Sequence, residues 1–163
     1  MLFLIVSLLV CLKVINRYAP DKYKIIFLRT KEIKLGTLRV DDTTILEWKP
    51  LFSLKTFYFH PGKAQEIYHT HSFTAFSLLL YGNYQEAFYD PMTCQESSKN
   101  RNRSRIIYIP RDRFHQITNS EGCRTVMLTG PWGDCYKEYN PITKEYITST
   151  HGRREIFREK SEQ

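Results

Sequence analysis

The sequence predicts a single all-β domain (mainly β), built as a sandwich or barrel with one helix at its start. Aromatic residues make up 14% of the 163 residues, with 11 Tyr and 10 Phe, and such side chains favour pleated, half-buried strands. Short apolar stretches alternate with turn signals such as Pro61-Gly62 and Gly130-Pro131, which is typical of antiparallel sheets. A chain of this length buries roughly two thirds of its unfolded surface, so it needs no disulfide or metal simply to fold.

Strands are expected where β-branched and aromatic residues cluster between turns. The expected strands are 24–28, 37–40, 45–48, 54–60, 66–80, 84–89, 105–109, 115–118, 124–129, 136–139 and 145–148. Gly82-Asn83 suits a tight hairpin turn with positive φ angles. The polar stretch 90–104 predicts a mobile loop, and the charged tail after His151 is compatible with a short helix. The chain therefore divides into a hydrophobic N-terminal helix (1–20), a β-barrel (21–150) and a charged tail (151–163).

The first fifteen residues are almost wholly apolar, interrupted by Ser7 and Lys13. The run is shorter than the ~18–20 residues that a spanning helix requires. No basic residue precedes it, and Ala19-Pro20 is a poor cleavage site because proline would follow the scissile bond. A helix packed against the barrel is the first interpretation, and a membrane anchor, an interfacial helix or a signal peptide are the alternatives.

Charge and cysteine content restrict the partners and the location. The net charge is +7, and basic residues cluster in 99–105 and 153–160, but Glu155 and Glu159 dilute the second cluster. No nucleic-acid-binding motif accompanies them, so solvated surfaces are expected rather than a nucleic-acid partner. The four cysteines are Cys11, Cys94, Cys123 and Cys135. No pair has CxxC spacing, so we expect reduced thiols in a cytoplasmic protein, with membrane anchoring as the alternative.

Three histidines form the candidate metal site. His69 and His71 are two residues apart, and side chains at i and i+2 of a strand project to the same face. Both imidazoles can therefore converge on one ion inside a barrel. His115 begins another expected strand and is the natural third ligand. Imidazole suits Fe, Zn, Cu and Ni.

The spacing around these histidines resembles the two motifs of the cupin family. In the first motif a glycine precedes His-x-His, a glutamate follows, and a second glycine ends the motif; here Gly62, His69-Thr70-His71 and Gly82 correspond. The second motif, Pro-x-Gly-x-x-His-x-x-x-Asn, corresponds to 110–119, with Pro110, His115 and Asn119 in register and Asp112 in place of the glycine. The segments 69–73, 124–131 and Trp132-Gly133 also resemble small cupin-like proteins of phages and bacteria. The resemblance implies a double-stranded β-helix, or jelly-roll, barrel with a metal at its centre.

One departure concerns the acidic ligand of the family motif. The family's glutamate would fall at Ala75 or Phe76, and neither can bind a metal. The site is then either a neutral three-histidine site, as in thiol dioxygenase-like cupins, or it gains an oxygen ligand from Glu86 or Gln85. Only one of these two neighbours can face inward from a strand.

Other residues are candidates for the pocket or for support of the ligands. Gln116 and Asn119 are expected to accept the second N–H of a ligand imidazole. Tyr58 and Tyr84 are possible pocket residues. Arg105 and Arg124 lie in expected strands and would bind a substrate carboxylate if they face inward. No catalytic residue is assigned.

The resemblance implies a mononuclear non-haem iron enzyme that oxidises or hydroxylates a small anionic substrate. Fe(II) is the expected divalent metal, with Zn, Mn and Ni as alternatives. A three-histidine set leaves the ion its full positive charge, which favours an anionic chelating ligand. The alternative function is a non-catalytic module that binds a metal or a small ligand. A homodimer and membrane contact through 1–15 remain open.

Overall fold

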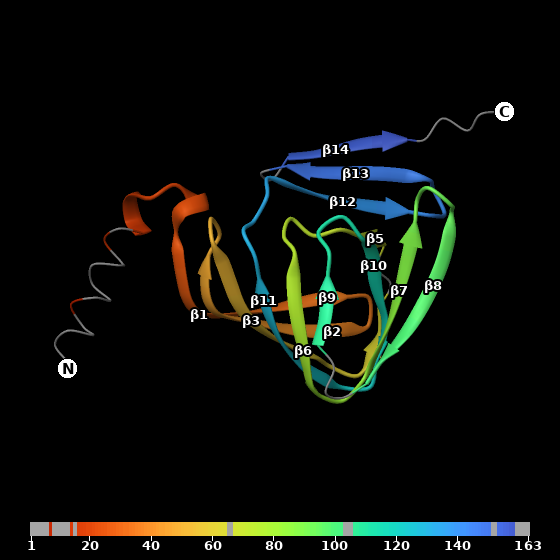
Figure 1. Ribbon diagram of the computed structural model, residues 1–163, viewed down its shortest axis with the longest axis horizontal. Coiled ribbons are helices and arrows are strands. Elements are labelled where there is room, and N and C mark those ends of the chain that lie inside the picture. The colour runs from red at the N-terminus through yellow and green to blue at the C-terminus, as the bar shows by residue number, and fades with distance from the viewer. Residues whose placement is uncertain are drawn as a thin grey trace.

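The computed structural model describes residues 7, 14, 16–64, 67–102, 106–150 and 153–158, and it consists of two antiparallel sheets (Figure 1). One sheet has the order β1-β2-β3-β11-β6-β9. The other has the order β14-β13-β12-β5-β10-β7-β8, with β4 paired to β10. The strands are β1 Ile25–Leu35, β2 Leu38–Trp48, β3 Phe52–Phe59, β4 Gly62–Lys63, β5 Tyr68–His69, β6 Ala75–Tyr81, β7 Tyr84–Asp90, β8 Gln95–Arg101, β9 Ile106–Ile109, β10 Phe114–Ser120, β11 Cys123–Thr129, β12 Cys135–Asn140, β13 Glu145–Thr150 and β14 Arg153–Arg158, and a short 3₁₀ helix, Asp21–Tyr23, precedes them.

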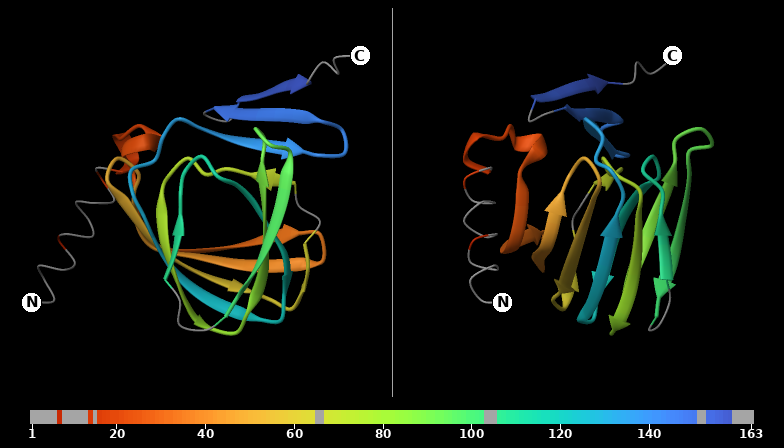
Figure 2. Two further views of the ribbon diagram at one scale, coloured as in Figure 1. Left: turned by 45° about the vertical axis from the view of Figure 1, so that its right-hand side comes forward. Right: turned by 60° about the vertical axis from the view of Figure 1, so that its left-hand side comes forward.

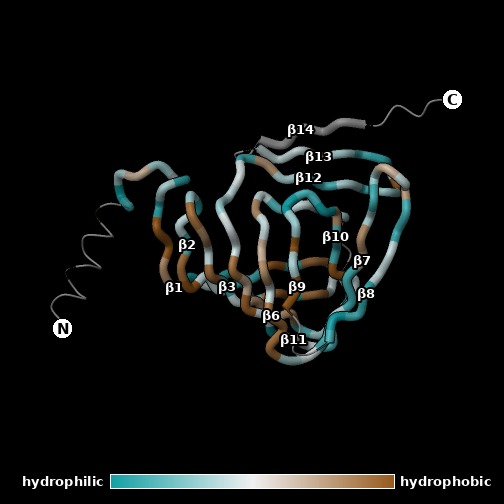
Figure 3. The backbone as a smooth tube through the Cα atoms, viewed as in Figure 1, coloured by the Kyte–Doolittle hydropathy of each residue, from teal (hydrophilic) through white to brown (hydrophobic). Residues whose placement is uncertain are grey.

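The two sheets curve around a common interior, and β12, β13 and β14 lie across one end of the barrel (Figure 2). Strand β6 shows how the sequence produces this shape. Ala75, Ser77 and Leu79 are buried, whereas the intervening Phe76 and Leu78 are exposed. Such alternation places every second side chain in the interior. Hydrophobic residues are frequent along β6, β9 and β11, while β8 is strongly hydrophilic (Figure 3).

The turn between β6 and β7 is the expected two-residue Gly82-Asn83 turn. Positive φ angles were expected at both residues, but of the two only Gly82 has one, +78°. A Cβ atom at this position would lie 2.0 Å from the carbonyl oxygen of Gly122, in the turn between β10 and β11. Gly82 is therefore required both by its φ angle and by the close approach of two turns.

Two clusters of buried side chains hold the barrel together. The larger cluster lies between the sheets and includes Leu38, Phe59, Leu79 and Ile107. The second contains Ala87 and four aromatic residues, Tyr68, Tyr89, Phe114 and Tyr139. It joins β7 and β10 to β12, so it fixes the end of the barrel where the histidines are placed.

Three expectations about elements are wrong. Part of the expected loop 90–104 is a strand, β8, which pairs with β7 along its whole length. The expected strand 66–80 is divided into β5 and β6, which belong to different sheets. Residues 153–158 form β14, paired with β13, rather than a helix. Backbone pairing with a neighbouring strand overrides the polar character of these segments.

The expected N-terminal helix lies largely outside the described residues. Residues 16–18 are helical, and Asn16 is tied to β1 because the backbone N–H of Ile25 donates to Asn16 Oδ1 at 2.8 Å. Within the part of the chain that the structure describes, no helix is both long enough and apolar enough to cross a membrane.

Candidate metal centre

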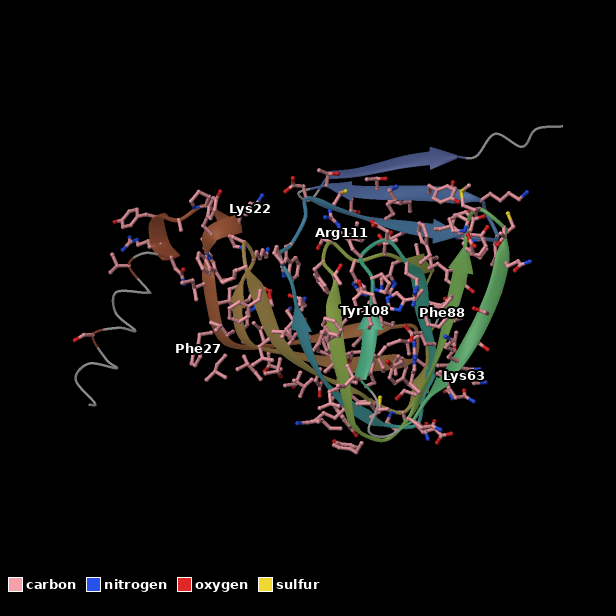
Figure 4. The ribbon with its side chains drawn as sticks, viewed as in Figure 1. Lys22, Phe27, Lys63, Phe88, Tyr108 and Arg111 are labelled. Carbon is pink, nitrogen blue, oxygen red and sulfur yellow. The ribbon has the colours of Figure 1, made fainter. Side chains whose placement is uncertain are left out.

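The three histidines come from two neighbouring strands and the segment that follows one of them. His69 ends β5, and its Cα partner on β10 is His115. Directly opposite residues of an antiparallel pair lie on the same face of the sheet. His71 follows where the chain leaves β5, and its backbone N–H donates to the carbonyl oxygen of Arg111 at 3.1 Å. Figure 4 shows Arg111 at the end of the barrel that faces β12 and β13.

The imidazole rings converge on one point. The nitrogen atoms able to bind a metal lie within 4.8 Å of one another, and Nε2 of His71 is 2.7 Å from Nε2 of His115. The ring centroid of His69 is 5.1 Å from that of His71 and 4.8 Å from that of His115. With metal–nitrogen bonds of about 2.1 Å, the nitrogen atoms of neighbouring ligands stand about 3 Å apart. The 2.7 Å between His71 and His115 is close to this value, and small movements of the rings would bring the whole set, now within 4.8 Å, around a single ion.

A buried carboxylate orients one of these rings. Nδ1 of His115 is 2.5 Å from Oε1 of Glu86, a distance at which its N–H donates to the carboxylate, and Nε2 is the nitrogen that lies next to His71. The second oxygen of Glu86 accepts a 2.7 Å hydrogen bond from Nε of Arg101. Metal-binding histidines commonly donate their other N–H to a carboxylate in this way.

Burial favours the protonation states that a metal needs. Burial, and next electrostatic repulsion from the neighbouring His115, lowers the pKa of His69 to about 3. The same two causes lower the pKa of His71 well below its ordinary value. Burial alone would raise the pKa of Glu86, but hydrogen bonds from His115 and Arg101 outweigh it and lower that pKa. Neutral His69 and His71 beside the ionised carboxylate of Glu86 fit a divalent cation.

A pocket of about 200 Å³ opens beside the histidines. One wall comes from β5, β7 and β10 and carries the metal-binding groups; the other comes from the opposite sheet and is mostly apolar. The lining residues are Ile33, Leu35, Val40, Phe57, Phe59, His69, His71, Ser77, Tyr84, Glu86, Ile109, His115, Ile117, Thr125 and Met127. Among these described residues there is no lysine or arginine.

Of the two expected oxygen-ligand candidates, Glu86 faces the pocket and Gln85 does not. Gln85 bonds instead with the hydroxyl of Thr118, at 3.3 Å. Glu86 contacts His115 rather than completing the set of nitrogen ligands, so it supports a ligand. Ala75 is buried in the core and Phe76 is exposed, which agrees with their exclusion as ligands.

The other predicted residues have different positions. Tyr84 lines the pocket. Tyr58 and Arg124 are not among its lining residues; they pack on each other, with the guanidinium carbon 5.4 Å from the ring centroid. Arg105 lies outside the described residues. The expectation that Arg124 faces a substrate thus gains no support from the described pocket, and the expectation for Arg105 stays a prediction.

Gln116 and Asn119 were expected to accept an imidazole N–H. The side chain of Gln116 forms a hydrogen bond with Tyr68. Asn119 on β10 lies opposite Gln85 on β7 in the strand pairing. Glu86 has the expected accepting role for His115.

The sequence did not indicate two residues near the site. Arg101 was expected in a solvated basic cluster, and Thr125 was not singled out. Strand pairing of Arg101 with Tyr84 and of Thr125 with Phe57 brings both to the barrel interior.

Comparison with known proteins supports the fold. No family model matches the sequence, and no curated protein matches it. Solved structures do match, among them oxalate decarboxylase from Bacillus subtilis at pH 4.6, with a TM-score of 0.50 and 15% identity over 66% of this chain and 29% of that chain. A second structure of this enzyme, studied for its Mn(II) centres, has the same score and identity over 69% and 32%.

These neighbours are cupins. The protein has the cupin fold. The jelly-roll barrel predicted from the histidine motifs is confirmed, and the cupin barrel spans about a third of the length of the oxalate decarboxylase chains it matches. At 15% identity, the likeness concerns the fold alone.

Proposed function

We propose that this cupin is a mononuclear metal enzyme that oxidises or hydroxylates a small anionic molecule. The observation that carries the proposal is the convergence of three imidazoles, one of them held by Glu86, at the wall of a pocket. Fe(II) is the proposed metal, with Mn, Zn and Ni as alternatives; the Mn(II) centres of the similar decarboxylase make Mn the first alternative to test. When bound, such an ion attracts an anionic ligand and supplies Lewis-acid or redox chemistry.

The protein's residues would position the ligand and exclude water. His69, His71 and His115 would hold the ion at the wall of the pocket. Glu86 holds the Nδ1 proton of His115, so Nε2 stays directed at the ion. Tyr84 lines the pocket, and burial raises the pKa of its hydroxyl, so it remains a hydrogen-bond donor.

The proposal also covers the cellular compartment and the kind of organism. The described cysteines Cys94, Cys123 and Cys135 are free thiols, which supports a reducing compartment such as the cytoplasm. The motif resemblance favours a bacterial or phage protein.

The test is purification without oxygen, followed by measurement of bound metal and of oxygen uptake with thiols and 2-oxo acids. We expect about one metal ion per chain, lost in His69→Ala and His115→Ala. His60→Ala is the matched control, because His60 bonds with Asp41 and Arg39 away from the pocket. Full metal content without turnover on any substrate would favour the non-catalytic binding module. Absence of metal under every loading condition would overturn both functions.

A further inference from the structure

The wall of the pocket opposite the histidines is mostly apolar and comes from the other sheet. Its residues include Phe57 and Phe59 on β3, Ile109 on β9 and Met127 on β11. Burying hydrocarbon against such a wall is favourable, by about fourfold in affinity for each methylene. The ligand should therefore have an apolar body, and not consist of charged groups alone.

A negative charge on the ligand can be neutralised only at the end of the pocket where the metal would bind. No described lining residue is cationic, and the nearby Arg101 is bonded to Glu86. An anionic group inside the pocket thus has the metal as its counter-charge. A second anionic group, placed against the apolar wall, would be desolvated without a partner, which is strongly unfavourable.

The volume limits the size of the body. A cavity of about 150 Å³ lined by aliphatic and aromatic residues holds one benzene molecule. The pocket here measures about 200 Å³. It therefore suits a single ring or a branched chain, with about ten non-hydrogen atoms in the whole ligand.

Thr125 adds a polar position on this wall. It lies on β11, its residue is 2% exposed, and its Oγ1 has no hydrogen-bond partner within the described part of the chain. A buried hydroxyl is rarely left without a partner. The strand carries it on the sheet opposite β5 and β10, so it faces the far end of a ligand whose head is at the metal.

Building on the function proposed above, we propose that the pocket binds a monoanionic chelator with a small hydrocarbon body, and that Thr125 recognises a hydroxyl or carbonyl group on that body. The metal would bind the chelating anionic group, which is the head of the ligand. The apolar wall would contact the hydrocarbon body, and Thr125 would form a hydrogen bond with the polar group on that body.

The hydrocarbon body is tested with two 2-oxo acids that share one chelating head, and with oxalate, a dianionic chelator that has no hydrocarbon body. Metal-loaded and metal-free protein are titrated by calorimetry with pyruvate, 4-methyl-2-oxopentanoate and oxalate. We expect 4-methyl-2-oxopentanoate to bind roughly 50-fold more tightly than pyruvate, from three added carbons, and only when metal is present. Pyruvate or oxalate binding as tightly as the larger acid, or no acid binding to metal-loaded protein, would overturn the ligand class while the metal site stands. A chain that takes up no metal overturns the proposed function itself, and metal content is measured first.

The role of Thr125 is tested by a ratio of affinities. Hydroxylation of the probe gives 4-hydroxy-4-methyl-2-oxopentanoate, and Thr125→Val removes the protein hydroxyl while keeping the shape. We expect the preference for the hydroxylated over the plain acid to fall about fivefold in Thr125→Val. Thr56→Val, on β3 and outside the pocket lining, should keep the wild-type ratio. An unchanged ratio in Thr125→Val, or a lowered resistance to urea showing that the hydroxyl has a structural bond, would overturn this assignment.

Discussion

Glu86 lies between the metal site and a partly buried arginine, because it bonds with His115 on one side and with Arg101 on the other. In Glu86→Gln the side chain keeps its size, but an amide accepts the His115 proton more weakly and its NH₂ group faces Arg101. We expect metal affinity to fall about 10–100-fold, as for other supporting residues of metal ligands. Competition with a coloured chelator measures this. Glu121→Gln, at an exposed carboxylate, is the matched control, and an unchanged affinity in Glu86→Gln would show that the carboxylate does not support the ligand.

Cysteine reactivity gives a second prediction at this scale. Cys123 is fully buried, and its burial raises the pKa of its thiol to about 11. Since the thiolate is the reactive form, Cys123 should resist alkylation at pH 7.5, whereas the exposed Cys94 should react. Peptide mass spectrometry after iodoacetamide treatment distinguishes them, with urea-unfolded protein as the control in which both react. Equal labelling of the two thiols in the folded protein would contradict the buried position of Cys123.

How far the site could be predicted depends on the residue. His69, His71 and His115 could be predicted together because motif spacing is a local feature of the sequence. The strand argument for His69 and His71 does not hold in the structure, because β5 ends at His69. The choice between Gln85 and Glu86 could not be predicted, because adjacent residues of a strand exchange faces when its register shifts by one. The register of β7 is fixed by its long-range pairing with β10, which no local pattern contains.

At the scale of elements, β2 and β3 hold a buried ionic cluster away from the metal. Lys55 is 5% exposed, and its Nζ is 3.4 Å from Asp42 Oδ2 and 3.5 Å from Glu47 Oε2. Lys55→Met would leave two buried carboxylates without this counter-charge. Removing one partner of a buried ionic pair costs about 3–5 kcal/mol in unfolding free energy.

Urea unfolding of paired variants checks this expectation. Lys31 also contacts Asp42, at 3.3 Å, but its side chain is half-exposed. Lys31→Met should therefore cost less than about 1 kcal/mol. Similar losses in the two variants would mean that the cluster is more hydrated than its burial indicates.

The elements that sequence reasoning missed have a common cause. Strand β8 is exposed over nearly its whole length, so no alternation of apolar residues marks it. Its backbone pairing with β7, across a short turn, is sufficient to make it a strand. β5 contains only Tyr68 and His69, and it could not be separated from β6 because both segments are rich in β-forming residues. A strand that is held by backbone pairing rather than by burial of its side chains has no characteristic pattern of apolar residues in the sequence.

At the scale of the whole molecule, the metal site joins parts of the chain that are distant in sequence. His69 and His71 lie at the crossing from one sheet to the other, and His115 is on β10, whose neighbours are β5 and β7. An ion bound by all three would hold this crossing against the centre of the second sheet. Since an unfolded chain does not present such a preformed set, binding should add directly to the free energy of folding.

Metal loading should therefore raise the unfolding temperature of the whole barrel. At a free metal concentration 100 times the dissociation constant, the stabilisation is about 2.7 kcal/mol, and each kcal/mol raises the midpoint by about 2–4 °C for a chain near this size. Calorimetric scans with increasing metal should show one transition that moves upward, because the ligands belong to a single cooperative unit. His60→Ala should show the same shift, and His69→Ala should show little or none. If metal raises the midpoint of His69→Ala as much as that of the wild type, the ion binds elsewhere on the chain, and the three-histidine site is not what couples metal to folding.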